Sequence, residues 1–74
     1  MYISINGVTA EFKTTGNITE VIISRRLELS FVDFMTSNSI NMKTFQRNDF
    51  ASRIIIETRQ LERAEALLKE YFGG

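Results

Sequence analysis

The 74-residue chain has the length of one small domain, with nine basic and nine acidic side chains, no cysteine and no histidine. Disulfides and the usual zinc sites are therefore excluded, and the balanced charge argues against a strongly basic nucleic-acid binder. The hydrophobic content of 43% is typical of a folded protein rather than a disordered segment. We expect a single domain over residues 1–74 that carries no cofactor and no metal.

Membrane insertion and secretion are not predicted. The longest apolar runs, at 21–23 and 54–56, are far too short to cross a bilayer. Residues 2–5 alternate in polarity and do not form the charged-then-apolar leader of a secreted protein. We therefore expect a cytoplasmic location with no membrane partner.

A β-hairpin is the first predicted element. Residues 2–5 and 8–13 each alternate between apolar and polar side chains, which is the period of a strand. Asn6-Gly7 lies between them, and this pair favours a two-residue hairpin loop because both central positions need positive φ. A second turn at 14–17 leads to a third strand at 18–24, which is rich in β-branched residues.

Residues 25–38 fit two patterns. Alternation continues as far as Leu29, whereas a helical stripe also runs through the segment. Ser30 and Asp33 have the spacing of a capping box. We predict a short helix at 31–38, preceded by a strand that can extend to Leu29.

The second half of the chain predicts two strands and a helix. After a polar connector at 37–41, strands are expected at 42–47 and 52–58, joined by a turn at Asn48-Asp49. The three consecutive isoleucines at 54–56 predict burial on both faces and a central strand.

The clearest helix is predicted at 59–72, with Thr58 as its cap and Gly73 at its end. Glu65 and Lys69 are spaced to form an ion pair along it. Its apolar stripe consists of Leu61, Ala64, Leu67, Leu68, Tyr71 and Phe72.

These elements predict an α+β fold. We expect a small, mostly antiparallel sheet of about five strands that begins with a ββ-hairpin, with a short middle helix and a C-terminal amphipathic helix on one face. Proline is absent from the chain. The sheet edges therefore lack one of the usual devices that prevent a partner's strand from pairing with them.

Catalysis is not predicted. Histidine and cysteine, the side chains that titrate or attack most readily near neutral pH, are absent. No nucleophile elbow, phosphate loop or calcium loop occurs, and the four glycines are scattered at positions 7, 16, 73 and 74. We therefore predict no catalytic residues.

Basic residues gather in one part of the sequence. Between positions 25 and 63 there are seven basic and five acidic side chains. Arg25 and Arg26 follow the third strand, where they are either contacts for phosphate or an acidic surface, or two solvated side chains.

Residues 43–50, KTFQRNDF, interleave cations and aromatic rings as a platform for single-stranded nucleic acid does. In a regular strand Lys43, Phe45 and Arg47 share a face, and Arg53 of the next strand can join them opposite the helices. The alternative places Phe45 in the core of an ordinary hairpin.

Two functions follow as hypotheses. The leading one is a small non-enzymatic module that binds another protein, with a homodimer as one form of association. The composition resembles in style that of phage or mobile-element accessory proteins, which bind and inhibit or modulate a host factor. The alternative is binding of single-stranded nucleic acid, RNA included, through a basic and aromatic sheet face. The candidate binding residues are Arg25, Arg26, Lys43, Phe45, Arg47 and Arg53.

Overall fold

The computed structural model describes all residues, 1–74, and contains five strands and two α-helices. In chain order the elements are β1 (Tyr2–Ile5), β2 (Val8–Thr15), β3 (Ile18–Ile23), α1 (Leu29–Ser37), β4 (Thr44–Arg47), β5 (Ser52–Glu57), a short 3-10 turn (Thr58–Gln60) and α2 (Leu61–Gly73).

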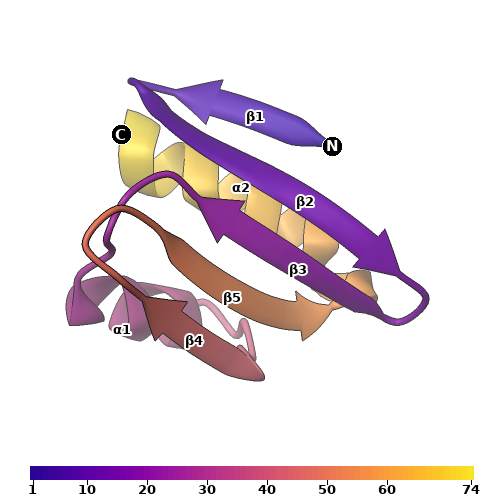
Figure 1. The fold of residues 1–74 in the computed structure, drawn as a ribbon. Helices are drawn as coiled ribbons and strands as arrows, with labels where there is room; N and C mark the ends of the chain where they lie inside the picture. Colours follow the sequence, from indigo (N-terminus) through magenta and orange to yellow (C-terminus); the bar gives the residue numbers. More distant parts are fainter.

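The five strands form one sheet in the order β1-β2-β3-β5-β4, and every neighbouring pair is antiparallel. Both helices lie behind the sheet in Figure 1, so they cover one face and leave the other open. α2 runs behind β2 and β3, whereas α1 lies behind β4. The predicted α+β fold, with helices on a single face, is confirmed.

The turns that join the first strands have the backbone that their sequences predict. Asn6 has φ of 49° and Gly7 has φ of 82°, as a hairpin loop with two positive-φ positions requires. This turn fixes the register of β1 on β2, in which Ile5 faces Val8 and Ile3 faces Ala10. The predicted first hairpin is therefore confirmed, and this register places the apolar side chains of its two strands on one face.

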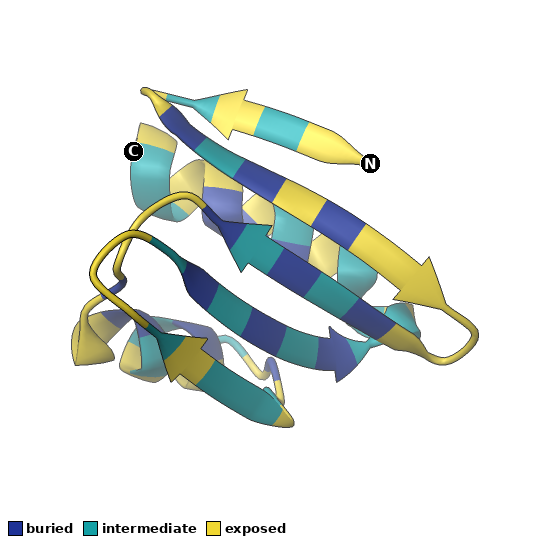
Figure 2. Cartoon of the chain, in the orientation of Figure 1, coloured by how far each residue is buried: buried dark blue, intermediate teal, exposed yellow.

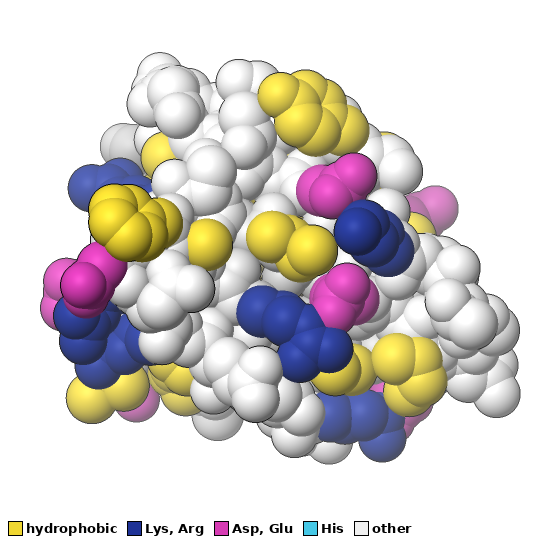
Figure 3. All heavy atoms as spheres, in the orientation of Figure 1, with side chains coloured by type: hydrophobic (Ala, Val, Ile, Leu, Met, Phe, Trp, Pro, Cys, Tyr) yellow, Lys and Arg dark blue, Asp and Glu magenta, His cyan; other side chains and the backbone are white.

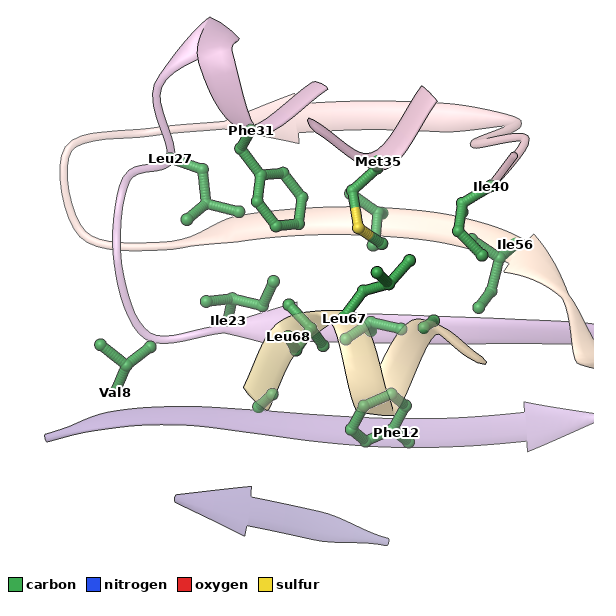
Figure 4. Close-up of a cluster of buried hydrophobic side chains, with 14 residues drawn as sticks. Val8, Phe12, Ile23, Leu27, Phe31, Met35, Ile40, Ile56, Leu67 and Leu68 are labelled. Carbon is green, nitrogen blue, oxygen red and sulfur yellow. The ribbon is translucent and has the colours of Figure 1, made fainter. Parts of the chain in front are cut away.

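The hydrophobic core lies between the sheet and the two helices. Along β2, β3 and β5, buried residues alternate with more exposed ones (Figure 2). Figure 4 shows the buried side chains of the strands pointing toward those of α1 and α2. The helices contribute Phe31, Met35, Ala64, Leu67 and Leu68 to this core.

Tyr71 joins the two helices. Its ring centroid lies 5.1 Å from that of Phe31 and 5.2 Å from that of Phe34, which are favourable separations for aromatic pairs. The predicted stripe of α2 is confirmed, and the predicted pair of Glu65 with Lys69 has its charged atoms 3.5 Å apart.

Three local predictions are wrong. β5 lies between β3 and β4, as predicted for a central strand, but its predicted burial on both faces is wrong. Ile54 and Ile56 are buried, whereas Ile55 is only half-buried because no helix covers its face. α1 begins at Leu29, so Ser30 already lies inside the helix and does not cap it. Thr58 does not cap α2 either, since its hydroxyl donates to the carbonyl of Gly16 (2.9 Å).

The start of β4 carries a β-bulge. Thr44 is the cross-strand partner of Ile55, yet the amide of Lys43 also donates to the carbonyl of Ile55 (2.7 Å). Two successive residues therefore face one residue of β5, which is the arrangement of a bulge. The predicted regular strand at 42–47 is thereby shortened to 44–47, and its alternation is broken at Lys43.

Candidate protein-binding edge

The register of β4 on β5 separates the residues that were predicted to form one surface. Phe45 lies opposite the buried residue Ile54, so it faces the helices and packs against the core. Arg53 lies opposite Gln46, on the open face of the sheet. The predicted surface that combines these two side chains is therefore wrong, because they project to opposite sides of the sheet.

Of the two remaining members of the predicted surface, Arg47 lines one hollow together with Arg53, whereas Lys43 lies in a different hollow. Arg47 lies opposite the buried Ser52, and its guanidinium donates to the carbonyl of Leu27 (2.7 Å). Lys43 lies in the bulge and lines a hollow on the open side together with Ile18 and Glu57. Nucleic-acid binding stays a prediction, but the flat basic and aromatic platform proposed for it is not formed.

The open face of the sheet has mixed character. Arg53 is paired with Glu20 of β3 and donates to the side chain of Gln46 (3.0 Å). Figure 3 shows basic, acidic and hydrophobic side chains interspersed over this face. A surface whose cations are already neutralised by neighbouring carboxylates offers little attraction to phosphates.

Arg25 and Arg26 lie in an exposed loop beside the β4–β5 turn. Arg26 forms an ion pair with Asp49 (3.2 Å), and both side chains are half or more exposed. The loop itself is held by the buried Ser52, whose hydroxyl donates to the carbonyl of Arg25 (2.7 Å) and accepts from the amide of Leu27 (2.8 Å). Arg25 and Arg26 thus lie in one loop, which is bonded to Ser52 next to Arg53 in the chain.

An uncharged groove lies between α1 and β4. Its volume is about 350 Å³ and it contains no ionisable side chain. It is lined by Val32 and Thr36 of α1, by Ser39, Ile40, Asn41 and Met42 of the connector, and by Phe45 of β4. The sequence did not indicate this site, because its lining residues fall in three separate predicted segments, a helix, a polar connector and a strand.

β4 forms an edge of the sheet because it pairs only with β5. The amide of Asn48 donates to the carbonyl of Ala51 (2.9 Å). Hydrogen-bonded and non-hydrogen-bonded pairs alternate along an antiparallel ladder. The backbone groups of Gln46 therefore face β5, whereas those of Phe45 and Arg47 face outward and have no strand beside them.

The surroundings of this edge carry an excess of positive charge. Lys43 and Arg47 are the only charged residues between positions 34 and 48. Arg63 of α2 adds a third cation at the far end of the connector, where its guanidinium donates to the carbonyl of Asn38 (2.9 Å). The one acidic residue of α1, Asp33, is exposed. Glu57 lies in one hollow with Lys43, so the edge has a modest excess of positive charge within a chain of zero net charge.

No family model matches this chain, and no curated protein or solved structure proved similar to it. Neither α1 nor α2 has the length and apolar character that crossing a membrane requires. The structure also contains no group of three or more acidic side chains that could hold a metal ion. The function must therefore be argued from the geometry of the β4 edge itself.

Proposed function

We propose that this protein is a non-enzymatic binding module that takes up an extended segment of another protein as an additional strand at the free edge of β4. The observation that carries the proposal is a coincidence of two features. The outward-facing backbone of β4 lies beside an apolar groove, and Phe45 belongs to both. Strand addition needs both features, because backbone pairing supplies affinity and pockets for alternate side chains supply specificity.

The bound segment would lie antiparallel or parallel to β4 with its side chains alternating between the two faces of the sheet. Residues on the helix side would enter the groove beside Val32, Met42 and Phe45, where apolar side chains fit best. Residues on the other side would lie next to Thr44 and Gln46, which project from the open face. The expected ligand therefore has apolar residues at every second position.

The charge of the edge supports an acidic partner. Lys43 and Arg47 lie at either end of the strand with no carboxylate between them, so acidic residues that flank the bound segment would be attracted and would associate faster. A second copy of this chain fits poorly here. Symmetric antiparallel pairing of two β4 strands would bring Lys43 and Arg47 of both copies to one interface, and an accumulation of like charges there opposes association.

Strand capture gives the module a simple way to act. A partner whose edge segment is held in the groove cannot use that segment for its own pairing, so binding inhibits or modulates it. We propose a cytoplasmic host protein as that partner. The resemblance in composition to phage and mobile-element accessory proteins supports this reading.

Selection from a displayed library of random twelve-residue peptides tests the proposal. The selected peptides should alternate apolar residues and carry flanking Asp or Glu. Thr36→Arg, which fills the groove from an exposed position of α1, should weaken binding of a selected peptide by about tenfold or more. Ser30→Arg adds the same charge to an exposed site of the same helix outside the groove and should have little effect. Equal binding by both variants would refute the proposed site.

A further inference from the structure

The opposite edge of the sheet differs from β4 in its charge. β1 pairs only with β2, and the first charged side chain of the chain is Glu11. No side chain of β1 is charged, and the strand has no proline or bulge to keep another strand away, which are the usual protections of an edge. The one charge beside it is the α-ammonium group of Met1, which donates to the carbonyl of Phe12 on β2. Pairing of two β1 strands would bring no charged side chains together, whereas pairing of two β4 strands would bring together Lys43 and Arg47 of both copies.

We propose that β1 pairs antiparallel with β1 of a second copy, giving a two-fold symmetric dimer with a continuous ten-stranded sheet. This inference goes beyond the proposed function, because it concerns the other edge and a different partner. The two β4 edges would lie at the outer ends of the joined sheet, as far apart as the order of strands allows.

The hydrogen bonds of β1 determine which backbone groups are free for this pairing. Met1 and Phe12 bond to each other in both directions, with N···O distances of 3.1 and 2.7 Å. Because such pairs alternate along the ladder, the backbone groups of Ile3 and Ile5 face β2. Those of Tyr2 and Ser4 face outward.

Two-fold symmetry then selects one register. Pairing centred on Ile3 sets Tyr2 of each copy opposite Ser4 of the other, so all four outward-facing amide groups find a carbonyl partner. Ile3 meets Ile3 of the second copy on the helix side, at a non-hydrogen-bonded position where opposing side chains are closest. Centring on Ser4 instead would pair Tyr2 with Asn6, whose backbone is occupied by the turn.

The apolar surface at this edge supports the same conclusion. Met1 is 58% exposed and Tyr2 is 65% exposed, and these are two of the five exposed large hydrophobic residues. Pairing would cover part of both side chains and the remaining surface of Ile3, which favours association. A four-residue strand buries little area, so the dimer should be weak and dependent on concentration. The dimer would nevertheless present two β4 edges, one from each copy, to a partner that carries several binding segments.

A cysteine substitution tests the register directly, because the chain has no cysteine of its own. Ile3→Cys places two thiols at the symmetry axis, within the range of side-chain separations that a disulfide spans. Mild oxidation at high protein concentration should convert most of this variant to a covalent dimer. Thr15→Cys, exposed at the end of β2, should stay largely monomeric. Equal cross-linking of both variants would refute the register.

A second measurement does not depend on cysteine chemistry. Sedimentation equilibrium of the unmodified protein should show a monomer–dimer equilibrium, and Ser4→Lys should reduce the association constant by about tenfold or more because it places cations at the interface. Gln46→Lys, the matched change at the β4 edge, should leave dimerisation unchanged. An unmodified protein that is monomeric at millimolar concentration would overturn the proposal. Ser4→Lys should still bind a selected peptide, which separates this inference from the proposed function.

Discussion

Phe45 is the cross-strand partner of Ile54, and Ile54 is completely buried. This single relationship decides the role of the aromatic ring. A ring on the open face would serve as a stacking platform for bases, whereas a ring beside Ile54 supports the core and forms one wall of the α1–β4 groove. Phe45 therefore contributes both to the stability of β4 and to the groove in which a ligand would bind.

Removing the ring should destabilise the fold. Phe45→Ala deletes a half-buried side chain, so we expect a loss of about 2 kcal/mol in the free energy of unfolding, below the ~3–5 kcal/mol of a fully buried phenylalanine. Urea denaturation measures this difference. Phe50→Ala is the matched control because Phe50 is 84% exposed in the turn. Equal effects of the two changes would contradict the assigned register of β4.

The hydroxyl of Ser52 should make a large contribution to the free energy of unfolding for a single polar group. It bridges the backbone of Arg25 and Leu27, and its residue is only 2% exposed. Ser52→Ala leaves both backbone groups without that partner and should cost about 1–3 kcal/mol of unfolding free energy. Amide exchange in the loop 24–28 should also become faster. Ser37→Ala, at an exposed position of α1, serves as the control. If the amides of loop 24–28 exchange as slowly in Ser52→Ala as in the unmodified protein, the bridging role of Ser52 is contradicted.

Glu57 should titrate at unusually low pH. The hydrogen bond from Arg59, together with the positive charge of that residue, lowers the pKa of Glu57 from its ordinary value of 4.5. Since the pKa is lower in the folded than in the unfolded chain, the pair stabilises the fold above pH 4.5 and this stabilisation disappears as the pH falls through the folded-state value.

Carboxyl carbon shifts measured by NMR across the acid range would give this pKa. Arg59→Ala should return it toward its ordinary value, and Glu57→Gln should flatten the acid limb of the stability profile. The side chain of Arg59 is 76% exposed and that of Glu57 is 30% exposed. Because water reaches the pair, its contribution to stability should be small and should shrink with added salt. An unchanged pKa in Arg59→Ala would rule out this cause.

Single-stranded nucleic acid should bind weakly or not at all. Arg53 is neutralised by Glu20, and the open face lacks the aromatic platform that stacking needs. Fluorescence titration of labelled oligonucleotides at low salt should show no saturable binding at micromolar protein. A steep dependence on salt that flattens in Arg47→Ala combined with Arg53→Ala would favour the nucleic-acid hypothesis over the protein-binding one.

The sequence predicts those structural elements that are determined by residues close together in the chain. Asn6-Gly7 has the backbone preference of its turn, and the apolar stripe of α2 repeats with the helical period, so both are correctly predicted. The bulge at Lys43 and Thr44 carries no comparable signal, because it arises from pairing with Ile55, a residue eleven positions beyond Thr44. The bulge displaces only Lys43 from the predicted binding surface. Phe45 and Arg53 are separated by the register of β4 on β5, which no local pattern in the sequence indicates.

The groove was missed for a related reason. Its walls come from α1, the connector and β4, and only the tertiary arrangement brings Val32 and Phe45 to one hollow. Nor does the order of strands follow from the chain order, because β5 inserts between β3 and β4. Without that order, no local pattern indicates that β4 is an edge.

Hydrogen exchange at β4 tests the central claim most directly. In the free protein the amides of Phe45 and Arg47 should exchange rapidly, whereas that of Gln46, which faces β5, should be protected. Addition of a library-selected peptide should slow exchange at Phe45 and Arg47 by about tenfold or more and leave Gln46 little changed. Protection that arises instead at Ile22 and Ile55 on the open face, with β4 unaffected, would contradict strand addition at this edge.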